Sequence, residues 1–341
     1  MVSDDDTIFD KQRSDNPRQP AMAMARREAL RCLAWSGVGV VWMMRGGVPR
    51  VFAASDPTLP AQIKRSDFVF AQISDSHIGF NKEANPDPGG TLQAALDQVR
   101  TIRPAFLLHT GDVSHLSKPE EFDTAAQLIG STRLETHYVP GEHDVLNDDP
   151  NLFFKRFSPQ APQGWYSFDY RGVHFIALTN VLNFKAGGLG HLGAEQLRWL
   201  DDDLRDKSTS MPIVVFTHIP LWNVYADWGW ATDDGEQALA LLRRFGSVTI
   251  LNGHIHQVIQ KVEGNVVFHS AMSTAYPQPA PGKAAGPGPL KLPAEQLRSA
   301  LGVSDISVAA RKAALTIRDH TLDRPVTVTT DSFFDSIFAG D

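Results

Sequence analysis

The sequence FVFAQISDSH, residues 68–77, joins a short apolar run to an aspartate and a histidine. The run is rich in Phe, Val and Ile and ends at a polar cluster, which is typical of a buried β-strand. Asp75 and His77 are two positions apart, so in an extended chain their side chains share one face and can reach one metal ion. The stretch therefore predicts a strand whose end delivers an Asp-x-His pair.

Four further predicted strands end in the same way. In chain order they deliver Asp112, then Glu142, His143 and Asp144, then His218, and finally the pair His254 and His256. Strand ends are where α/β sheets gather ligand-binding groups. A Gly-Asp turn or a single histidine is more often structural, but five such strand ends in one chain favour a shared site.

The chain from residue 54 onward alternates β-rich runs with amphipathic ones. Strands are predicted at 68–73, 105–110, 137–140, 173–180, 213–218, 248–252 and 266–271, and helices at 91–103, 120–129, 194–205 and 236–245. This alternation indicates a layered α/β fold in which helices cover the sheets. The Pro-, Gly- and Ala-rich segment 277–289 is predicted to be an irregular surface loop, although a domain boundary there is an alternative.

The ordered motifs resemble the calcineurin-like metallophosphoesterase superfamily, over most of the chain from residue 68 to residue 271. The resemblance implies a four-layer α/β/β/α sandwich around two adjacent metal ions. It also implies that the first metal is held by Asp75, His77, Asp112 and His256, and the second by Asp112, Glu142, His218 and His254. His143 would be the catalytic histidine near the leaving group, and Asp144 would orient it.

The chemistry of such a site follows from the charge of a phosphate ester. Two cations a few ångströms apart lower the pKa of a bridging water and bind the phosphoryl oxygens. Imidazole and carboxylate ligands suit Mn, Fe, Zn or Co. We therefore expect a metal-dependent phosphoester hydrolase with two transition-metal ions, using a metal-bridged hydroxide. The alternatives are a catalytically impaired metal-binding or partner-binding scaffold on the same fold, a hydrolase of another ester, or an oxidative metalloenzyme.

Three stretches narrow the resemblance further. HTGDVSHLSKPEEFD at 109–123, GWYSFD at 164–169 and GHIHQ at 253–257 are similar to exported bacterial members related to class III cyclic nucleotide phosphodiesterases. This likeness implies phosphodiester hydrolysis without fixing the substrate. Nucleotides, glycerophosphodiesters, phospholipid headgroups and sugar-phosphate esters all fit the class.

Glu142 departs from the family pattern, which has Asn before the His-Asp pair. A carboxylate can also bind the second metal, but it adds a negative charge and one methylene. We expect Glu142 to remain a metal ligand and to shift preference toward diesters or other less charged substrates. The alternative is a neutral substitution that only alters metal affinity.

Other polar and aromatic residues near the motifs are candidates for substrate contact. His115, Trp222 and Tyr225 follow the motif strands closely enough to wall a pocket, although the aromatic pair could equally pack on its own loop. His109 and His269 lie inside apolar strands and are predicted to be buried structural residues.

The N-terminal residues are not predicted to belong to the hydrophobic core. Arg26-Arg27, an apolar run at 32–44 and small residues near Ala53 resemble a twin-arginine export signal over residues 1–53. An uncleaved anchor or a buried N-terminal helix are the alternatives. Cleavage would remove the sole cysteine, Cys32, and leave a metallophosphoesterase domain at 54–275 with residues 276–341 packed on it.

Composition limits the partners. The chain of 341 residues is 42% hydrophobic, which suits a globular enzyme, and its net charge of −7 argues against general affinity for nucleic acid or anionic membrane. We expect a small phosphoester substrate, the export machinery as a partner, no permanent membrane span after cleavage, and a periplasmic or otherwise exported protein. The oligomeric state is left open.

Overall fold

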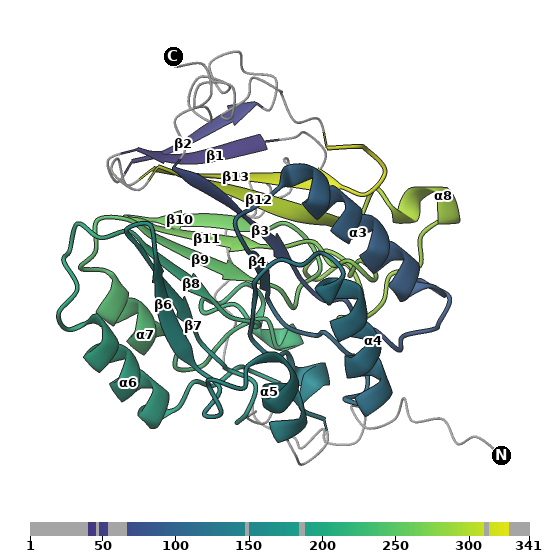
Figure 1. Ribbon diagram of the computed structural model, residues 1–341, viewed down its shortest axis with the longest axis horizontal. Coiled ribbons are helices and arrows are strands. Elements are labelled where there is room, and N and C mark those ends of the chain that lie inside the picture. The colour runs from purple at the N-terminus through teal and green to yellow at the C-terminus, as the bar shows by residue number, and fades with distance from the viewer. Residues whose placement is uncertain are drawn as a thin grey trace, which may run out of the picture. The chain divides into compact units, whose positions relative to one another are not determined.

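The strand that carries the Asp-x-His pair, β3 (Phe68–Ile73), lies inside a seven-stranded sheet with the order β2-β1-β13-β12-β3-β4-β5. The computed structural model describes residues 40–45, 48–53, 67–146, 150–183, 188–309 and 314–326 (Figure 1). The other strands of this sheet are β1 (Val40–Arg45), β2 (Val48–Ala53), β4 (Leu107–His109), β5 (Thr136–Tyr138), β12 (Gly302–Ala309) and β13 (Ala314–Thr321). Strands β3, β4 and β5 run parallel.

A second sheet of six strands has the order β10-β11-β9-β8-β7-β6. Its strands are β6 (Tyr166–Tyr170), β7 (Val173–Ala177), β8 (Ile213–Phe216), β9 (Val248–Asn252), β10 (Gln260–Glu263) and β11 (Val266–Ser270). Strands β7, β8, β9 and β11 run parallel, so their carboxyl ends lie along one edge of the sheet.

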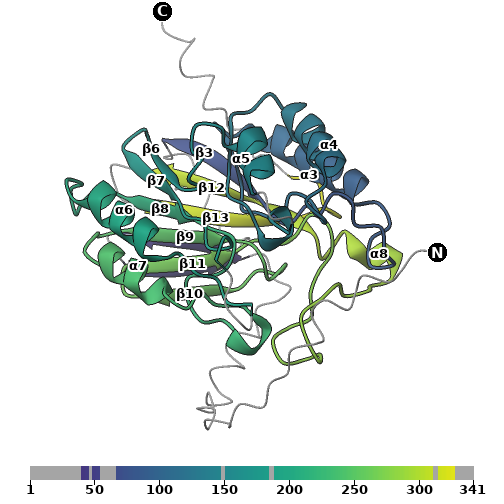
Figure 2. The ribbon, with the colours of Figure 1, turned by 90° about the horizontal axis from the view of Figure 1, so that it is seen from below.

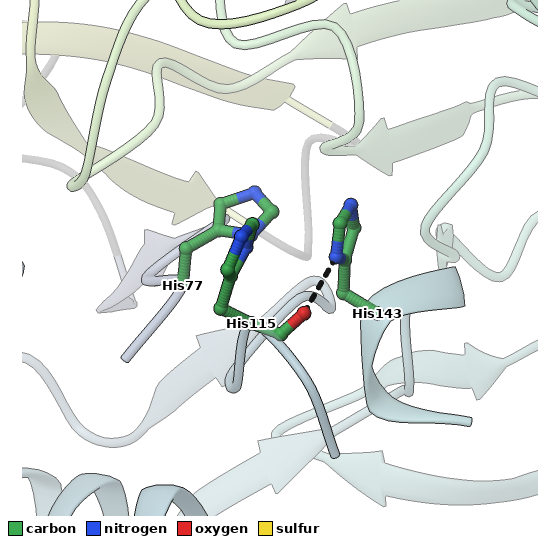
Figure 3. Close-up of side chains that lie close together, drawn as sticks. All are labelled: His77, His115 and His143. Atoms are coloured by element: carbon green, nitrogen blue, oxygen red, sulfur yellow. Dashed lines mark hydrogen bonds between the residues drawn. The ribbon is translucent and has the colours of Figure 1, made fainter. Parts of the chain in front are cut away.

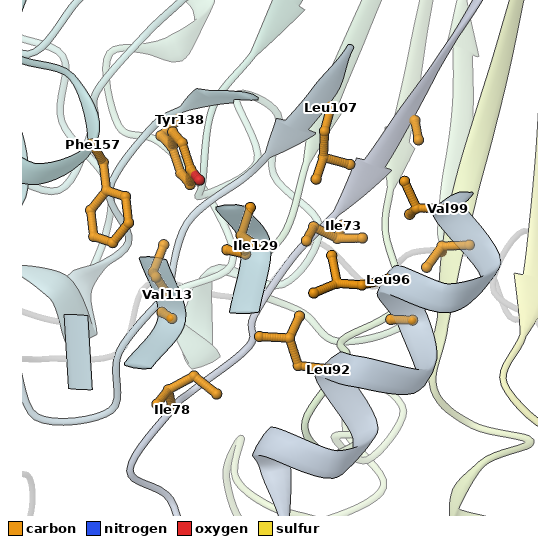
Figure 4. Packing of buried hydrophobic residues seen from close by; sticks show 14 of the residues in the cluster. Ile73, Ile78, Leu92, Leu96, Val99, Leu107, Val113, Ile129, Tyr138 and Phe157 are labelled. Carbon is orange, nitrogen blue, oxygen red and sulfur yellow. The ribbon is translucent and has the colours of Figure 1, made fainter. Parts of the chain in front are cut away.

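Helices cover the outer faces of both sheets (Figures 1 and 2). The helices are α3 (Pro88–Ile102), α4 (Pro119–Gly130), α5 (Asn151–Phe157), α6 (Ala194–Leu204), α7 (Gly235–Leu242) and α8 (Ala294–Leu297). Helices α3, α4 and α5 share a buried apolar cluster with the seven-stranded sheet (Figure 4), and α6 and α7 share one with the six-stranded sheet. A third cluster joins the inner faces of the two sheets. The predicted four-layer α/β/β/α sandwich is confirmed.

The alternation of side chains along β3 explains why it is central. Phe68 and Phe70 face the second sheet, whereas Ala71 and Ile73 face the helices. The Phe70 ring stacks on Phe106, with 5.2 Å between ring centroids, and meets Phe175 of the second sheet edge-on at 5.3 Å. Because both faces are buried, the strand is apolar except at Gln72, which is itself buried and donates a hydrogen bond of 3.0 Å to the Thr110 hydroxyl.

Helix α3 shows how local sequence sets the boundaries of an element. Pro88 occupies the first turn, and the Asp87 carboxylate accepts a hydrogen bond of 2.8 Å from the Gly90 backbone N–H. Both features favour a helix start. The helix ends at Ile102, and the next residue, Arg103, has a left-handed φ of 54°.

The seven strands and four helices predicted from periodicity are all present, with ends that differ by a few residues. Among the described residues, the strands β1, β2, β6, β10, β12 and β13 and the helices α5 and α8 were not predicted. Residues 276–341 were expected to pack on the domain, but β12 lies within the sheet itself, paired with β3 through Ile306 and Phe70. The segment 277–289 is irregular, as expected.

The predicted signal segment overlaps the edge of the sheet. Residues 1–39, including Arg26-Arg27 and Cys32, lie outside the described residues. Strands β1 and β2 form an antiparallel hairpin, and β1 pairs with β13 through Trp42 and Ile317. A chain cleaved after Ala53 would lack this hairpin, so the hairpin and that cleavage are mutually exclusive. Within the described part of the chain, no helix is both long and apolar enough to cross a bilayer.

We predict that Phe70→Ala lowers the free energy of unfolding by about 3–5 kcal/mol, because it removes a ring buried between the two sheets. The measurement is urea-induced unfolding followed by circular dichroism. Leu152→Ala on α5, where the side chain is 37% exposed, is the control, and it should change the free energy of unfolding by less than about 0.5 kcal/mol. Equal losses in the two variants would contradict this packing.

Candidate metal centre

The loops after β3, β4, β8 and β9 are tied to one another by backbone hydrogen bonds. The Asp75 N–H donates to the Gly111 carbonyl at 2.9 Å, and the His77 N–H donates to the Asp112 carbonyl at 2.9 Å. The Gly253 N–H donates to the His218 carbonyl at 3.1 Å. The first two bonds join loops of the seven-stranded sheet and the third joins loops of the six-stranded sheet, while the bond of 2.7 Å from His218 Nδ1 to the Thr110 carbonyl links the two sheets.

A first cluster contains four of the predicted ligands. The ligand atoms of Asp75, His77, Asp112 and His256 all lie within 4.8 Å of one another. His77 Nε2 is 3.5 Å from Asp112 Oδ2, and His256 Nε2 is 3.3 Å from Asp75 Oδ1. All four side chains are buried. The cluster offers two imidazoles and two carboxylates to a single ion.

A second cluster contains Glu142, His218 and His254. Glu142 lies between the two histidines: its Oε2 is 2.8 Å from His218 Nε2, and its Oε1 is 2.9 Å from His254 Nδ1. Asp112 links the clusters, because its Oδ2 is also 3.4 Å from His218 Nε2. The structure thus brings together all seven predicted ligand residues, with Asp112 in the bridging position.

The polar atoms of the second cluster fit a metal ion better than they fit one another. Glu142 Oε2, His218 Nε2 and His254 Nδ1 are buried, and none has a hydrogen bond of acceptable geometry despite the short separations. Buried polar atoms are normally satisfied. A cation that receives these lone pairs would satisfy all three, and the N and O donor set suits a divalent transition metal.

The outer ring nitrogens of two ligands are fixed by backbone carbonyls. His218 Nδ1 donates to the Thr110 carbonyl at 2.7 Å, and His256 Nδ1 donates to the Tyr276 carbonyl at 2.5 Å. Because a carbonyl only accepts, the proton of each neutral ring is on Nδ1, and the Nε2 lone pair points into the cluster. This is the usual arrangement around a metal-bound histidine.

Several proposed ligands have left-handed backbone conformations that are rare for residues with a side chain. The φ angles are 53° at Asp75, 40° at His77, 53° at Asp112, 70° at His254 and 53° at His256. Such conformations are costly and are maintained at functional sites by the surrounding structure. They turn each side chain sharply at its strand end.

Gly141 and Gly253 are required because neighbouring atoms lie too close to them for a side chain to fit. A Cβ on Gly253 would lie 2.0 Å from Ser74 Oγ and 2.6 Å from Asp75 Oδ2. A Cβ on Gly141 would lie 2.1 Å from Asp112 Oδ1. No side chain fits at these distances, so glycine before Glu142 and before His254 lets two loops touch a ligand carboxylate.

The predicted catalytic histidine lies between the clusters. A ring nitrogen of His143 is within 4.8 Å of carboxylate oxygens of Asp112 and Glu142. Its Nδ1 donates to the His115 carbonyl at 2.7 Å, and Figure 3 shows Nε2 on the side of the ring away from that carbonyl. Burial alone would lower the pKa of His143, but the Asp112 and Glu142 carboxylates raise it above its usual value.

Asp144 forms hydrogen bonds to two loops, and its charge also contributes to the raised pKa of the His143 ring. Its carboxylate accepts hydrogen bonds from the N–H groups of Val113 at 3.0 Å, Ser114 at 2.8 Å and Gly141 at 3.0 Å. The Ser114 hydroxyl donates a fourth bond at 2.9 Å. Asp144 therefore joins the loop after β4 to the loop after β5, and it orients His143 only by fixing that loop.

The second cluster carries opposite charges in mutual contact. Burial alone would raise the pKa of Glu142, but the imidazoles of His254 and His218 hold it well below its usual value. Burial opposes charge on His218 too, yet the Asp112 and Glu142 carboxylates raise its pKa well above the usual value. The carboxylates therefore stabilise positive charge at this position, and a bound metal ion would provide that charge without protonation of the histidines.

The residues predicted to contact substrate have different surroundings. The His115 ring stacks on His143, with 4.9 Å between ring centroids, and lies beside the first cluster. The Trp222 ring packs on Phe268, at 5.8 Å, and below the Lys261 ammonium, among residues that pack on α6 and α7. Those contacts belong to the outer face of the second sheet, not to the metal cluster.

Tyr225 and the two strand histidines have clear positions. The Tyr225 ring meets Trp228 edge-on at 5.2 Å, and its hydroxyl lies against Gly282 of the Pro-rich segment. His109 is fully buried, as predicted, with Nε2 2.8 Å from Ser76 Oγ. His269 is also buried and pairs with Asp319 at 3.1 Å.

Tyr276 is a site residue that the motifs did not identify. Its hydroxyl is 3.2 Å from His77 Nε2, its carbonyl holds His256, and its ring lies 4.8 Å from the His77 ring. Burial and the nearby Asp112 and Asp75 carboxylates raise its pKa well above 10. The sequence offered one signal for Tyr276: it lies after the end of a strand, β11, as the metal ligands lie after the ends of their own strands.

The family model described as calcineurin-like phosphoesterase matches residues 68–258. The chain therefore belongs to the calcineurin-like phosphoesterase family, and it is a dinuclear metal-dependent phosphoester hydrolase. It is 27% identical over 215 residues to a 3',5'-cyclic-nucleotide phosphodiesterase of Nostoc sp., covering 60% of this chain and 78% of that protein. It is 30% identical over 209 residues to a glycerophosphodiester phosphodiesterase of Enterobacter lignolyticus, covering 56% of this chain and 71% of that protein.

Solved structures share the fold at low sequence identity. A dimetal phosphatase from Danio rerio superimposes with a TM-score of 0.58 at 16% identity, covering 75% of this chain and all of that one. A purple acid phosphatase from yellow lupin (Lupinus luteus) seeds superimposes with a TM-score of 0.55 at 12% identity, covering 82% of this chain and 55% of that one. These likenesses support the architecture described above.

We predict that Gly253→Ala weakens metal binding about 10-fold or more, because the added Cβ would displace Ser74 and Asp75. The measurement is metal content by mass spectrometry after dialysis against a graded chelator. Gly130→Ala is the matched control, because nothing lies within 4 Å of its Cβ at the end of α4. Unchanged metal content in Gly253→Ala would show that the close approach does not shape the site.

Proposed function

We propose that the chain is a phosphodiesterase, and the observation that carries this proposal is the position of Glu142 between His218 and His254. Asp75, Asp112 and Glu142 give the site three carboxylates. Counting only the ionised protein ligands against two divalent cations, the three carboxylates leave a net charge of about +1, whereas the family's neutral Asn would leave about +2. A diester monoanion would neutralise the charge of +1 left with Glu142, whereas a monoester dianion would neutralise the charge of +2 left with Asn.

The charge argument carries weight because the ligand side chains are largely buried: those of His254 and Glu142 are 11% and 18% exposed, and the others are buried. Uncompensated charges cost more in a low-dielectric interior than in water, so a bound dianion would leave an excess negative charge that the site cannot screen. The names of the Nostoc and Enterobacter relatives both denote phosphodiesterases, which supports the same preference. The specific diester remains to be chosen among nucleotides, glycerophosphodiesters, phospholipid headgroups and sugar-phosphate esters.

The protein groups take distinct parts in the proposed reaction. Two bound cations, which we propose to be Mn, Fe, Zn or Co, would polarise the phosphoryl oxygens and supply hydroxide near neutral pH. Because His143 Nδ1 is committed to the His115 carbonyl, Nε2 is the atom that delivers a proton to the leaving alkoxide.

The test combines metal analysis with two chromogenic substrates on one sample of purified protein. We expect about two transition-metal ions per chain and faster turnover of bis(p-nitrophenyl) phosphate than of p-nitrophenyl phosphate. His143→Ala should retain both ions and lose about 100-fold or more in diester turnover. Failure to bind metal or to hydrolyse either ester after loading with Mn, Fe, Zn or Co would favour the scaffold alternative.

Glu142→Asn tests the charge argument directly. The variant should still bind two ions, and its ratio of diester to monoester kcat/KM should fall about 10-fold, equivalent to about 1.4 kcal/mol of differential transition-state stabilisation. Glu142→Gln, which restores neutrality at the original length, should show the same direction. An unchanged substrate ratio in both variants would mean that Glu142 does not determine the ester class.

We further propose export through the twin-arginine route, which carries folded proteins and suits an enzyme that binds its metals before crossing the membrane. The support is the Arg26-Arg27 pair with its apolar run. Periplasmic expression with intact-mass measurement should give a chain that begins near residue 54. A full-length mass would instead indicate that β1 and β2 stay in the sheet and that the segment is retained.

A further inference from the structure

His77 differs from the other Nε2 ligands in what holds its outer nitrogen. His218 and His256 donate Nδ1–H to backbone carbonyls, whereas His77 Nδ1 lies 3.4 Å from the Nδ1 of another side chain, His115. The two rings meet edge-on, with 5.5 Å between their centroids and an interplanar angle of 69° (Figure 3). The orientation of one ligand in the first cluster therefore depends on a side chain that mutation can change without moving the backbone.

The direction of this hydrogen bond follows from the ligand role of His77. His77 Nε2 faces Asp112 Oδ2 at 3.5 Å and His256 Nε2 at 3.2 Å, so the Nε2 lone pair must be available to an ion. A neutral imidazole with a lone pair on Nε2 carries its proton on Nδ1. His77 Nδ1–H is thus the donor and His115 Nδ1 the acceptor, which places the proton of a neutral His115 on Nε2.

The same residue also holds the catalytic histidine. The His115 carbonyl accepts the Nδ1–H of His143 at 2.7 Å, and the His115 ring stacks on the His143 ring with an interplanar angle of 15°. The ring of Phe80 meets His115 edge-on at 5.2 Å. His115 therefore contacts a proposed metal ligand with its ring nitrogen and the catalytic histidine with its carbonyl and its ring face.

Helix α4 and the loop after β3 keep His115 in place. Its N–H donates to the Ile78 carbonyl at 2.9 Å and to Glu121 Oε2 at 3.2 Å, and Leu116 N–H donates to the same Glu121 oxygen at 2.7 Å. Glu121 is buried in the first turn of α4. The backbone of residue 115 is therefore anchored independently of its ring, and substitution of the side chain should leave the His143 hydrogen bond intact.

We propose that His115 is a positioning residue that sets the tautomer and the ring orientation of His77 and, through its carbonyl, those of His143. This inference rests on the proposed metal-dependent function and assigns His115 a role other than the predicted substrate contact. Partners of metal-bound histidines contribute about 10–100-fold in metal affinity. Loss of the His115 acceptor should therefore weaken the first metal site and spare the second.

The experiment compares two substitutions that differ in their acceptors. His115→Phe keeps a planar ring against His143 and Phe80 but offers no acceptor to His77. His115→Gln gives up the ring but offers an amide oxygen. Both retain the carbonyl that holds His143. Mn²⁺ is titrated into metal-free wild-type protein and each variant by calorimetry, and kcat and KM for bis(p-nitrophenyl) phosphate are measured at saturating Mn²⁺.

We expect wild-type protein to bind two Mn²⁺ ions and His115→Phe to bind one of them about 10–100-fold more weakly, with the other affinity and the KM unchanged. His115→Gln should restore the affinity to within about 3-fold of wild type. His115→Leu should behave like His115→Phe, and it provides the acceptor-free variant if the Phe protein is unstable in a thermal melt.

Three results would overturn the inference in distinguishable ways. Wild-type affinities in both acceptor-free variants, together with a raised KM, would make His115 a substrate contact and leave the proposed function standing. Wild-type protein that binds no Mn²⁺ would remove the proposed function and this inference together. Weak binding in His115→Gln equal to that in His115→Phe would show that the ring shape, and not the acceptor, is what His77 requires.

Discussion

The structure depends on placing carboxylates and imidazoles together in a buried site. Asp112 is the centre of this constraint: its Oδ2 lies 3.5 Å from His77 Nε2 and 3.4 Å from His218 Nε2, and its Oδ1 accepts the His143 backbone N–H at 2.9 Å. Two carboxylates in one buried cluster repel unless positive charge lies between them. Cation binding is therefore the condition under which the rest of this site is favourable.

In this fold, the buried strands provide stability and the loops beyond their ends carry the metal ligands. Apolar strands buried on both faces provide a rigid frame, and each ligand sits just beyond a strand end, where the backbone turns sharply. The strained φ angles at Asp75 and Asp112 are held by hydrogen bonds between loops and not by the residues' own preferences. The stability that packing gives to the strands thus offsets the cost of the strained backbone at the metal ligands.

The sequence predicted features that depend on neighbouring residues but not features that depend on contacts between distant parts of the chain. The ligand motifs and β3 were predictable because hydrophobic periodicity and residue spacing are contained in a few neighbouring positions. The pairing of β12 with β3 joins Ile306 to Phe70 across a long stretch of chain, which periodicity does not encode. The bonds of Asp144 and the position of Tyr276 were missed for the same reason, since they depend on which loops meet.

Glu142 and His115 modify the two halves of the centre by different physical means. Glu142 adds a formal charge beside His218 and His254, so its effect extends to any anion that binds there. His115 adds no ligand and acts by holding the His77 ring, so its effect is confined to metal affinity and geometry in the first cluster. Asp112 contacts ligands of both clusters, so the charge balance to which Glu142 contributes is complete only when both ions are bound. The influence of Glu142 on ester class should therefore be largest when both ions are bound.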